Sequence, residues 1–523
     1  MSTHKYIDRI CIVITVIALI ATVVFMFGEK IGITKTVDED SEAHESEVLF
    51  TKNDLDSGWD RTDATEITLS EDTVLVNGTG AYPYNNGVYI SEAGRYIISG
   101  TLTDGSITVS AHDSSKVWIY LDGVSVYCSD DAAFIVDQAD KVFLTLADGS
   151  VNTFESGGRY SDEALSDNTS GVIFSHDDLT INGSGSLDIK GAYKHGIDCN
   201  DSLTITGGNI TITAAGDGIH ANDGVSVTGA DIKITAADDG INAGDAFVSA
   251  GGTIDIDGCY EGIEALTVDI TDGDITISCS DDGINANGGN SSFAGAGPMG
   301  GRMGDAQFPG MEGSAPVEGM PHGDRNTEHP QRPDDGQRPQ MGKTGQKPQM
   351  SGDDKGAKTG NDTAASEDNG GEETWIHISG GNITITNATG RDADGLDSNG
   401  DIIITGGNLL ISLTDSGNNC AIDHAGESGG VCTISGGTVI ACGNSSMAEG
   451  FDDTSAQASI LYTYREGFSD GSKITITDET GNTLLSWEVP YSFSSVVISC
   501  PEMVSGKTYN VTVGDMTESL TAK

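Results

Sequence analysis

Two adjacent carboxylates stand directly before a glycine in DDGINA at residues 238–243, and the same six residues return at 281–286. Carboxylate oxygens bind hard cations such as Ca²⁺, and paired carboxylates act as acid and base in glycoside hydrolysis. Like charges at close range repel, so an arrangement that gathers many of them indicates that a cation lies between them. These residues are the first candidates for a functional site.

Related forms of the motif recur along the chain. KHGIDC, GDGIHA, DDGINA, YEGIEA and DDGINA carry glycines at 196, 218, 240, 262 and 283, a spacing of 22, 22, 22 and 21 residues. The motif resumes later as ADGLDS and CAIDH. If the apolar residue of each copy points inward, the next residue points to solvent, and the residue before the glycine forms a second column. Equivalent positions of stacked strands would lie roughly 4.8 Å apart.

The two columns supply candidate ligands. At an effective dielectric constant near 20, carboxylates at that spacing repel by roughly 3.5 kcal/mol, so the columns favour bound calcium. Solvated corner residues, with Asp-Gly serving the turn, are the alternative. The residues expected to bind metal are Asp217, Asp238, Asp239, Glu261, Asp281, Asp282, Asp392 and Asp394. The residues expected to contact a bound ligand are His195, Asp198, His220, Asn242, Glu264, Asn285, Arg391 and Asp397.

We interpret the two histidines of these columns, His195 and His220, as ordinary column members rather than as ligands of a transition metal. No second arrangement of histidine or cysteine accompanies them in the sequence. Nine cysteines are scattered without Cys-x-x-Cys spacing, and we interpret most of them as small buried residues.

Short alternating strands must position these residues. LTITGGNITIT at 203–213 and VSVTGADIKIT at 225–235 alternate with a period of two, and about 22 residues separate equivalent strands. This pattern predicts an all-β, single-stranded parallel β-helix, a solenoid with about 22 residues per rung. Leucine-rich repeats and nonapeptide calcium repeats lack support, because neither their leucine pattern nor a nine-residue period is present. After residue 445 the strands predict an antiparallel β cap.

The N-terminal part predicts attachment to a membrane. Residues 10–27 are 18 consecutive residues without a charge, preceded by Lys5 and Arg9, which favours a single-pass cell-membrane anchor with an extracellular body. A cleaved signal peptide and secretion are the alternative. The expected order is a cytoplasmic tail (1–9), an anchor or signal segment (10–27), a spacer (28–57), β-helix (58–288), a disordered Gly-, Pro- and Met-rich insertion (289–372), further β-helix (373–444) and the cap (445–523).

Charge limits the class of partner. The chain has 80 acidic and 26 basic residues and a net charge of −54, which argues against nucleic acid, whose phosphates need Lys and Arg. Such a surface suits divalent metal.

Several motifs resemble a known family. AGRYIISGTLTDGSITVSAHDSSKVWIYLDGVSV, DKVFLTLADGSVNTF, HDDLTINGSGSLDI, the DDGI motifs and GKTYNVTVG resemble, in the same order, a clostridial-type carbohydrate-binding domain-containing protein family. The similarity covers about residues 67–288 and 373–520. It implies a non-catalytic, polysaccharide-lyase-like β-helix at the cell surface that binds calcium and acidic sugars such as polygalacturonate, with cellulose as a further ligand.

The expected function is therefore calcium-dependent binding of an acidic plant-wall polysaccharide, without catalysis. A pectate lyase or glycoside hydrolase is one alternative; the lyase would need a basic residue near calcium, and Arg391, beside Asp392 and Asp394, is one of few in the repeats. A hydrolase would need two carboxylates with different roles, and acidic pairs are too frequent here to be specific. A surface adhesin or structural solenoid is the other alternative.

Overall fold

The computed structural model describes residues 50–59, 61–71, 73–287, 373–426 and 429–523. The predicted tail and anchor (1–27), most of the predicted spacer (28–57) and the predicted insertion (289–372) lie outside the described residues. Within the described ranges, no helix combines the length and apolar character needed to cross a membrane.

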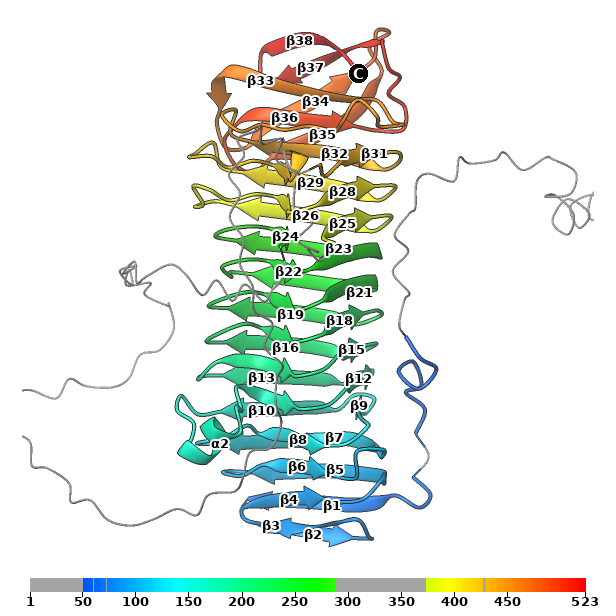
Figure 1. The fold of residues 1–523 in the computed structure, drawn as a ribbon, viewed down its shortest axis with the longest axis vertical. Helices are drawn as coiled ribbons and strands as arrows, with labels where there is room; N and C mark the ends of the chain where they lie inside the picture. The colour runs from blue at the N-terminus through cyan, green and yellow to red at the C-terminus, as the bar shows by residue number, and fades with distance from the viewer. Residues whose placement is uncertain (1–49, 60, 72, 288–372, 427–428) are drawn as a thin grey trace, which may run out of the picture. The chain divides into compact units, whose positions relative to one another are not determined.

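The strands form where buried apolar and exposed polar side chains alternate along the sequence. In β16 (Asn209–Ala214) isoleucine and alanine are buried, and the asparagine and threonines between them are exposed. Each repeat, which we call a rung, pairs in parallel with the next rung one repeat later. The strands of successive rungs therefore stack into three columns (Figure 1).

The first and second columns belong to one 22-stranded sheet. The first column holds β9 (Lys141–Leu146), β12 (Leu179–Gly183), β15 (Leu203–Ile205), β18 (Gly224–Val227), β25 (Trp375–Ile378), β28 (Asp401–Ile404) and β31 (Cys432–Ile434). The second column holds β10 (Val151–Ser156), β13 (Ser186–Gly191), β16, β19 (Asp231–Ala236), β26 (Asn382–Asn387), β29 (Asn408–Leu413) and β32 (Thr438–Gly443).

The third column is a 12-stranded sheet, and it carries the DDGI motifs. Its isoleucines, such as Ile219, Ile241 and Ile263, are fully buried and stack rung upon rung in the core. Its strands are β3 (Ala81–Tyr84), β4 (Gly87–Ile90), β6 (Ile107–Ser110), β8 (Phe134–Gln138), β11 (Gly171–Ser175), β14 (His195–Cys199), β17 (Ile219–Ala221), β20 (Ile241–Ala243), β22 (Ile263–Ala265), β24 (Ile284–Ala286), β27 (Leu396–Ser398) and β30 (Ile422–His424).

Long strands join the first two columns. They are β1 (Thr65–Glu71), β5 (Gly94–Leu102), β7 (Lys116–Cys128), β21 (Ala246–Asp257) and β23 (Thr267–Cys279). In β21 a bulge at Gly251 and Gly252, with φ of 132° and 91°, turns the strand round the corner without ending it. At the start of the described fold the pairing is antiparallel, between β1 and β2 (Thr73–Asn77) and between β3 and β4.

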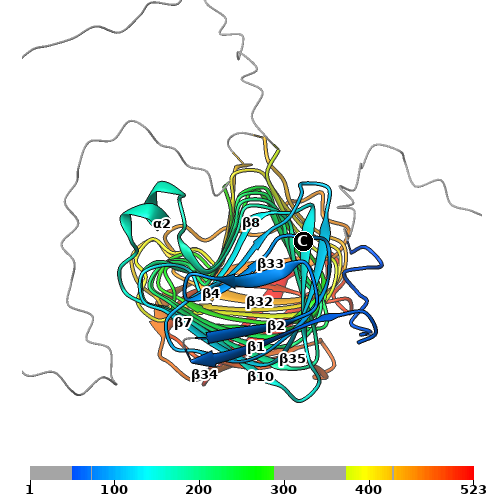
Figure 2. The same ribbon diagram turned by 90° about the horizontal axis from the view of Figure 1, so that it is seen from below.

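The predicted fold class is wrong as a description of this architecture. The chain is all-β, as expected, but it is not an open solenoid of separate short strands. Because long strands run through two columns each, the main sheet is continuous and closes round one apolar core together with the third column (Figure 2). The predicted transmembrane helix forms no part of the described fold.

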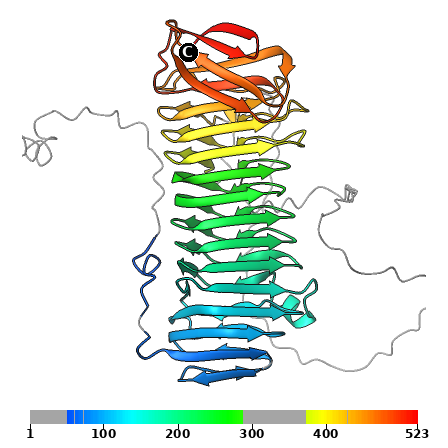
Figure 3. The same cartoon turned by 180° about the vertical axis from the view of Figure 1, so that it is seen from behind.

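The C-terminal strands divide between two sheets (Figure 3). The strands β33 (Ser459–Phe468) and β36 (Phe493–Ser499) pair antiparallel with the end of the main sheet. A four-stranded sheet covers them, made of β34 (Ser472–Thr477), β35 (Thr483–Val489), β37 (Thr508–Val513) and β38 (Met516–Thr521), and residues of both sheets form a second apolar cluster. The eight described cysteines are buried and free.

A short helix, α2 (Asp162–Ser166), lies outside the stacked strands, between β10 and β11 (Figures 1 and 2). Ser161 caps it, because its hydroxyl accepts a hydrogen bond from the backbone N–H of Ala164. The loop that contains α2 lengthens its rung and forms one wall of the pocket described below.

Candidate functional site

The third column places the predicted outward residues in register. We call this set the outer column. Each member is the backbone partner of the next, in the order Asp198, His220, Asn242, Glu264, Asn285, Asp397 and Asp423.

The residues before the glycines form a second line, which we call the inner ladder: Asp217, Asp239, Glu261, Asp282 and Asp394. The four aspartates of this line accept from the backbone of the following rung. The N–H of Asp239 donates to Asp217 Oδ1 at 3.2 Å, and the N–H of Glu261 donates to Asp239 Oδ1 at 3.2 Å. The N–H of Asp394 donates to Asp282 Oδ1 at 2.7 Å. These bonds give the acids a structural role beside any binding role.

Asparagines join the two lines. Asn242 Nδ2 donates to Asp239 Oδ2 at 3.1 Å and to Glu264 Oε2 at 2.6 Å. Asn285 Nδ2 donates to Asp282 Oδ2 at 3.2 Å and to Glu261 Oε2 at 3.1 Å. Within the described part of the chain, the Oδ1 atoms of both asparagines are buried and accept no hydrogen bond. Two acceptors therefore stay unsatisfied among carboxylates, a setting in which a cation is stabilised.

Burial and mutual repulsion raise the pKa values of these acids. Burial, and then the charges of Glu264 and Asp239, raise the pKa of Glu261 to about 9. The same two causes act on the remaining acids, because each is removed from water and faces other carboxylates. Their pKa values rise to about 8 for Asp394, about 7 for Asp282 and Glu264, and about 6 for Asp239 and Asp397.

Two places along the columns bring three carboxylates together. Asp217, Asp238 and Asp239 offer oxygens within 4.8 Å of one another, and so do Asp394, Asp397 and Asp423. Asp238 is exposed, so the first cluster is open to solvent on one side. Several carboxylate oxygens at such distances are the ligand set that calcium takes, and calcium tolerates irregular geometry.

Five predicted site residues lie outside the two lines: His195, Asp238, Asp281, Arg391 and Asp392. Arg391 and Asp392 are exposed in the segment before β27. Asp281 is half-buried at the corner, and its hydrogen bond with Tyr260 is the main cause that raises the pKa of the Tyr260 hydroxyl. Tyr260 is 49% exposed.

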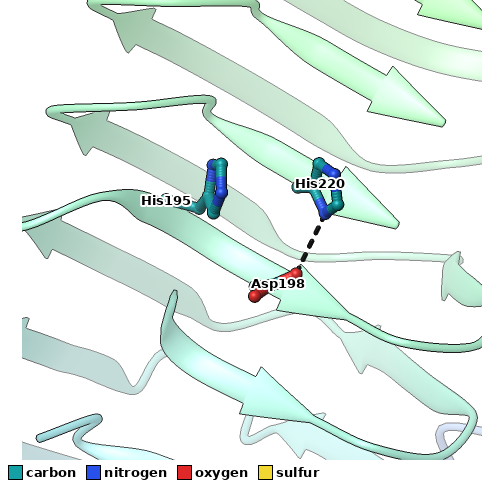
Figure 4. Close-up of side chains that lie close together, drawn as sticks. All are labelled: His195, Asp198 and His220. Carbon is teal, nitrogen blue, oxygen red and sulfur yellow. Dashed lines mark hydrogen bonds and ion pairs between the residues drawn. The ribbon is translucent and has the colours of Figure 1, made fainter. Parts of the chain in front are cut away.

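The N-terminal end of the columns differs chemically, because two histidines replace acids there (Figure 4). His220 Nδ1 lies 3.0 Å from Asp198 Oδ1, and the hydroxyl of Ser170 donates to Asp198 Oδ2. Burial opposes the charge of Asp198, but the hydrogen bonds from His220 and Ser170 outweigh it and lower the pKa of Asp198. The rings of His195 and His220 stack with centroids 4.8 Å apart.

A pocket of about 370 Å³ opens beside this end of the columns, and Asp198 and His220 line it. Sequence reasoning missed its other walls, which include Ser170 and Tyr193. Tyr193 stacks on Tyr160 with ring centroids 4.5 Å apart. The available signal is the break in the 22-residue period between β10 and β11, which brings in residues 157–170.

Part of the chain matches a known protein family. Residues 84–265 match the family model described as "Carbohydrate-binding domain-containing protein". This stretch belongs to that family. A protein of the same description from Acetivibrio thermocellus is 38% identical over 128 residues, which are 24% of this chain and 45% of the relative. The chain thus spans less than half the length of that curated relative.

A solved structure is also similar to this chain. It is titled as the polysaccharide lyase-like protein from C. thermocellum, in a gadolinium derivative, and is 32% identical. The match covers 43% of this chain and 95% of the solved chain, with a TM-score of 0.42.

Proposed function

We propose that the protein binds an acidic polysaccharide through calcium held on the outer column and inner ladder, without cleaving it. The observation that carries this proposal is the gathering of acids in the inner ladder and the outer column, where burial and repulsion raise the pKa values of Glu261, Asp394, Asp282 and Glu264. At neutral pH such an array must hold protons or a cation, and a divalent cation relieves the repulsion of several acids at once.

Bound calcium would also overcome the electrostatic repulsion between this acidic chain and an anionic glycan. A chain of net charge −54 repels an anionic glycan, whereas an ion bound at the exposed edge of the array can accept a sugar carboxylate as a further ligand. Tyr260, half-exposed beside the array, offers a flat face on which a sugar ring can pack. Polygalacturonate fits this chemistry best, and the description of the matched family supports a carbohydrate partner.

Retention on immobilised polygalacturonate tests the proposal. We expect the full chain to be retained in Ca²⁺ and released by EGTA, while an uncharged polysaccharide column retains it less. Equal retention with and without EGTA would contradict the calcium dependence. Release of unsaturated or reducing products from polygalacturonate would instead show a lyase or a hydrolase.

A matched pair of variants locates the site. Asp394→Asn combined with Asp397→Asn removes two charges. The first substitution keeps a side-chain oxygen that can still accept the N–H of Cys420, which Asp394 accepts at 2.9 Å. We expect at least a tenfold loss of retention. Asp515→Asn, at an exposed hairpin of the cap, is the control for an altered surface charge and should bind as the unmodified chain does. Equal loss in both variants would place binding elsewhere.

We also propose that residues 10–27 hold the protein at the cell membrane with the described part outside. This rests on the uncharged 18-residue segment and the basic residues before it. Extraction of the native protein from membranes by detergent, but not by salt or carbonate, is the expected result. Recovery of a shortened chain in the medium would instead show cleavage.

A further inference from the structure

Two histidines and one carboxylate meet at the N-terminal end of the columns, from neighbouring strands β14 and β17. His195, Asp198 and His220 each offer a ligand atom, and these atoms lie within 4.8 Å of one another (Figure 4). This set differs from the acidic clusters, because two of its three ligands are imidazole nitrogens. Imidazole suits zinc, copper and nickel, whereas calcium takes oxygen ligands.

The ring of His195 is held in place by Asp217 of the next rung. The backbone N–H of Asp217 donates to His195 Nδ1 at 3.1 Å, and Asp217 Oδ2 lies 3.1 Å from the same nitrogen. An ion on Nε2 would require the ring proton to be on Nδ1, where the carboxylate of Asp217 can accept it. Carboxylates commonly hold metal-ligating histidines in this way.

The other ring nitrogen of His195, Nε2, makes no hydrogen bond within the described fold. His195 is 5% exposed, and among the described residues its Nε2 is buried without a hydrogen-bond partner. A buried, unpaired polar atom of this kind is costly, and a bound ion would satisfy it.

Asp198 and His220 complete the set and open it to solvent. Their direct contact at 3.0 Å shares a proton that a divalent ion can replace. The hydroxyl of Ser170 holds the second oxygen of Asp198. Both Asp198 and His220 line the pocket of about 370 Å³, so an ion on this set would keep a coordination position open to the pocket. Lys194, which also lines the pocket, favours an anionic ligand at that position.

We propose that His195, Asp198 and His220 form a site for a borderline divalent transition metal such as Zn²⁺, with its open position facing an anionic ligand in the pocket. The site uses Asp198 and His220 at the N-terminal end of the outer column, and Asp217 of the inner ladder acts as the residue that positions His195. It gives the two histidines a role that their sequence pattern alone does not indicate.

Metal titration of the tag-free full chain, stripped with EDTA and dialysed, tests this proposal. Co²⁺ serves as the probe because its visible absorption bands report nitrogen ligands and coordination number, and Zn²⁺ should displace it. We expect one equivalent to bind in the presence of millimolar Ca²⁺. His220→Gln should weaken binding at least tenfold, while His112→Gln, at an exposed histidine outside this set, should leave it unchanged.

Two further measurements distinguish a loss of metal binding from a general loss of stability. Glutamine keeps a side-chain N–H that can donate to Asp198, so we expect metal-free His220→Gln to unfold at nearly the same temperature as the unmodified chain. Asp217→Asn should weaken Co²⁺ binding less than His220→Gln does, because it acts through His195. Unchanged Co²⁺ affinity in His220→Gln, or displacement of Co²⁺ by Ca²⁺, would overturn the proposal. Co²⁺ binding is measured without any glycan, so failure of this test is distinguishable from failure of the proposed function, which retention on polygalacturonate measures.

Discussion

At the scale of single residues, each acid of the inner ladder meets opposing demands. Asp217 accepts the N–H of Asp239, so an acceptor is needed at that position, yet its charge faces other carboxylates. Asparagine in the outer column eases this conflict, because one amide group donates to two acids. Asn285 is the most buried of these donors, at 2% exposed, and it links Glu261 with Asp282.

We expect Asn285→Asp to destabilise the calcium-free protein. The change removes two donated hydrogen bonds and adds a third carboxylate between two others, so roughly 2–4 kcal/mol should be lost. Chemical unfolding in EGTA measures this loss. Asn510→Asp is the matched control, because Asn510 uses its Oδ1 to accept from Ser519, and aspartate can still accept. If Ca²⁺ fails to recover any of the stability of Asn285→Asp, the array does not bind calcium at this point.

At the scale of the structural element, the glycines of the third column fix how closely rungs approach. A Cβ on Gly240 would lie 2.6 Å from the carbonyl oxygen of Gly262 and 2.7 Å from Ile256 Cγ2. Neither neighbour can move freely, since one is backbone and the other lies in the core. The glycine therefore lets the acid before it and the asparagine after it stack on the next rung.

Gly240→Ala should cost roughly 1–3 kcal/mol, the usual range for overpacking, and should weaken calcium binding because it separates two rungs of the array. Unfolding in denaturant and calorimetric titration with Ca²⁺ measure the two effects. Gly158→Ala is the control: its added Cβ would meet one atom, the carbonyl oxygen of Ala192 at 3.6 Å, which is ordinary contact. Equal stability of the two variants would mean that the corner can relax.

Much of the local arrangement could be predicted from the period alone. The regular spacing of the glycines aligns Asp217 with Asp239 and Glu261, because parallel rungs of equal length keep register. The long strands that join the first and second columns could not be predicted from the period. SAGGT in β21 has the composition of a loop, but positive φ values at Gly251 and Gly252 allow a bulge within a continuous strand.

Contacts between residues far apart in the sequence could not be predicted from the repeat pattern either. Asp54 is fully buried on the outer face of the main sheet, where it pairs with Lys141 at 3.0 Å and accepts from Thr180 at 2.6 Å. Ser170 reaches Asp198 from a loop that breaks the period. Such contacts depend on tertiary packing, which a repeat does not encode.

At the scale of the whole molecule, apolar stacking and acidic repulsion act against each other. The core cluster runs through all the described rungs and favours tight stacking. The carboxylates on the third column resist it once they are charged. Stability must therefore depend on what neutralises them, whether protons or metal.

The metal-free protein should lose thermal stability as pH rises from about 5 to about 9. Glu261, Asp394 and Asp282 have folded-state pKa values of about 9, 8 and 7, above the ordinary values of 4.5 for Glu and 3.8 for Asp. Over this range the folded chain holds protons that the unfolded chain has released, so higher pH favours unfolding. Ca²⁺ competes with those protons and should raise the midpoint more at pH 8 than at pH 5. At a hundred times its Kd it adds about 2.7 kcal/mol per site.

Thermal unfolding in EGTA and in Ca²⁺, at several pH values and constant ionic strength, measures both effects. Glu261→Gln is expected to flatten the pH dependence in EGTA, because it removes the group with the highest pKa of the array. Asp515→Asn, which removes one exposed charge from the cap, should leave the curve unchanged and so controls for net charge. A midpoint in EGTA that is constant from pH 5 to 9 would show that the carboxylates are not forced together, and the calcium array would then lack its driving force.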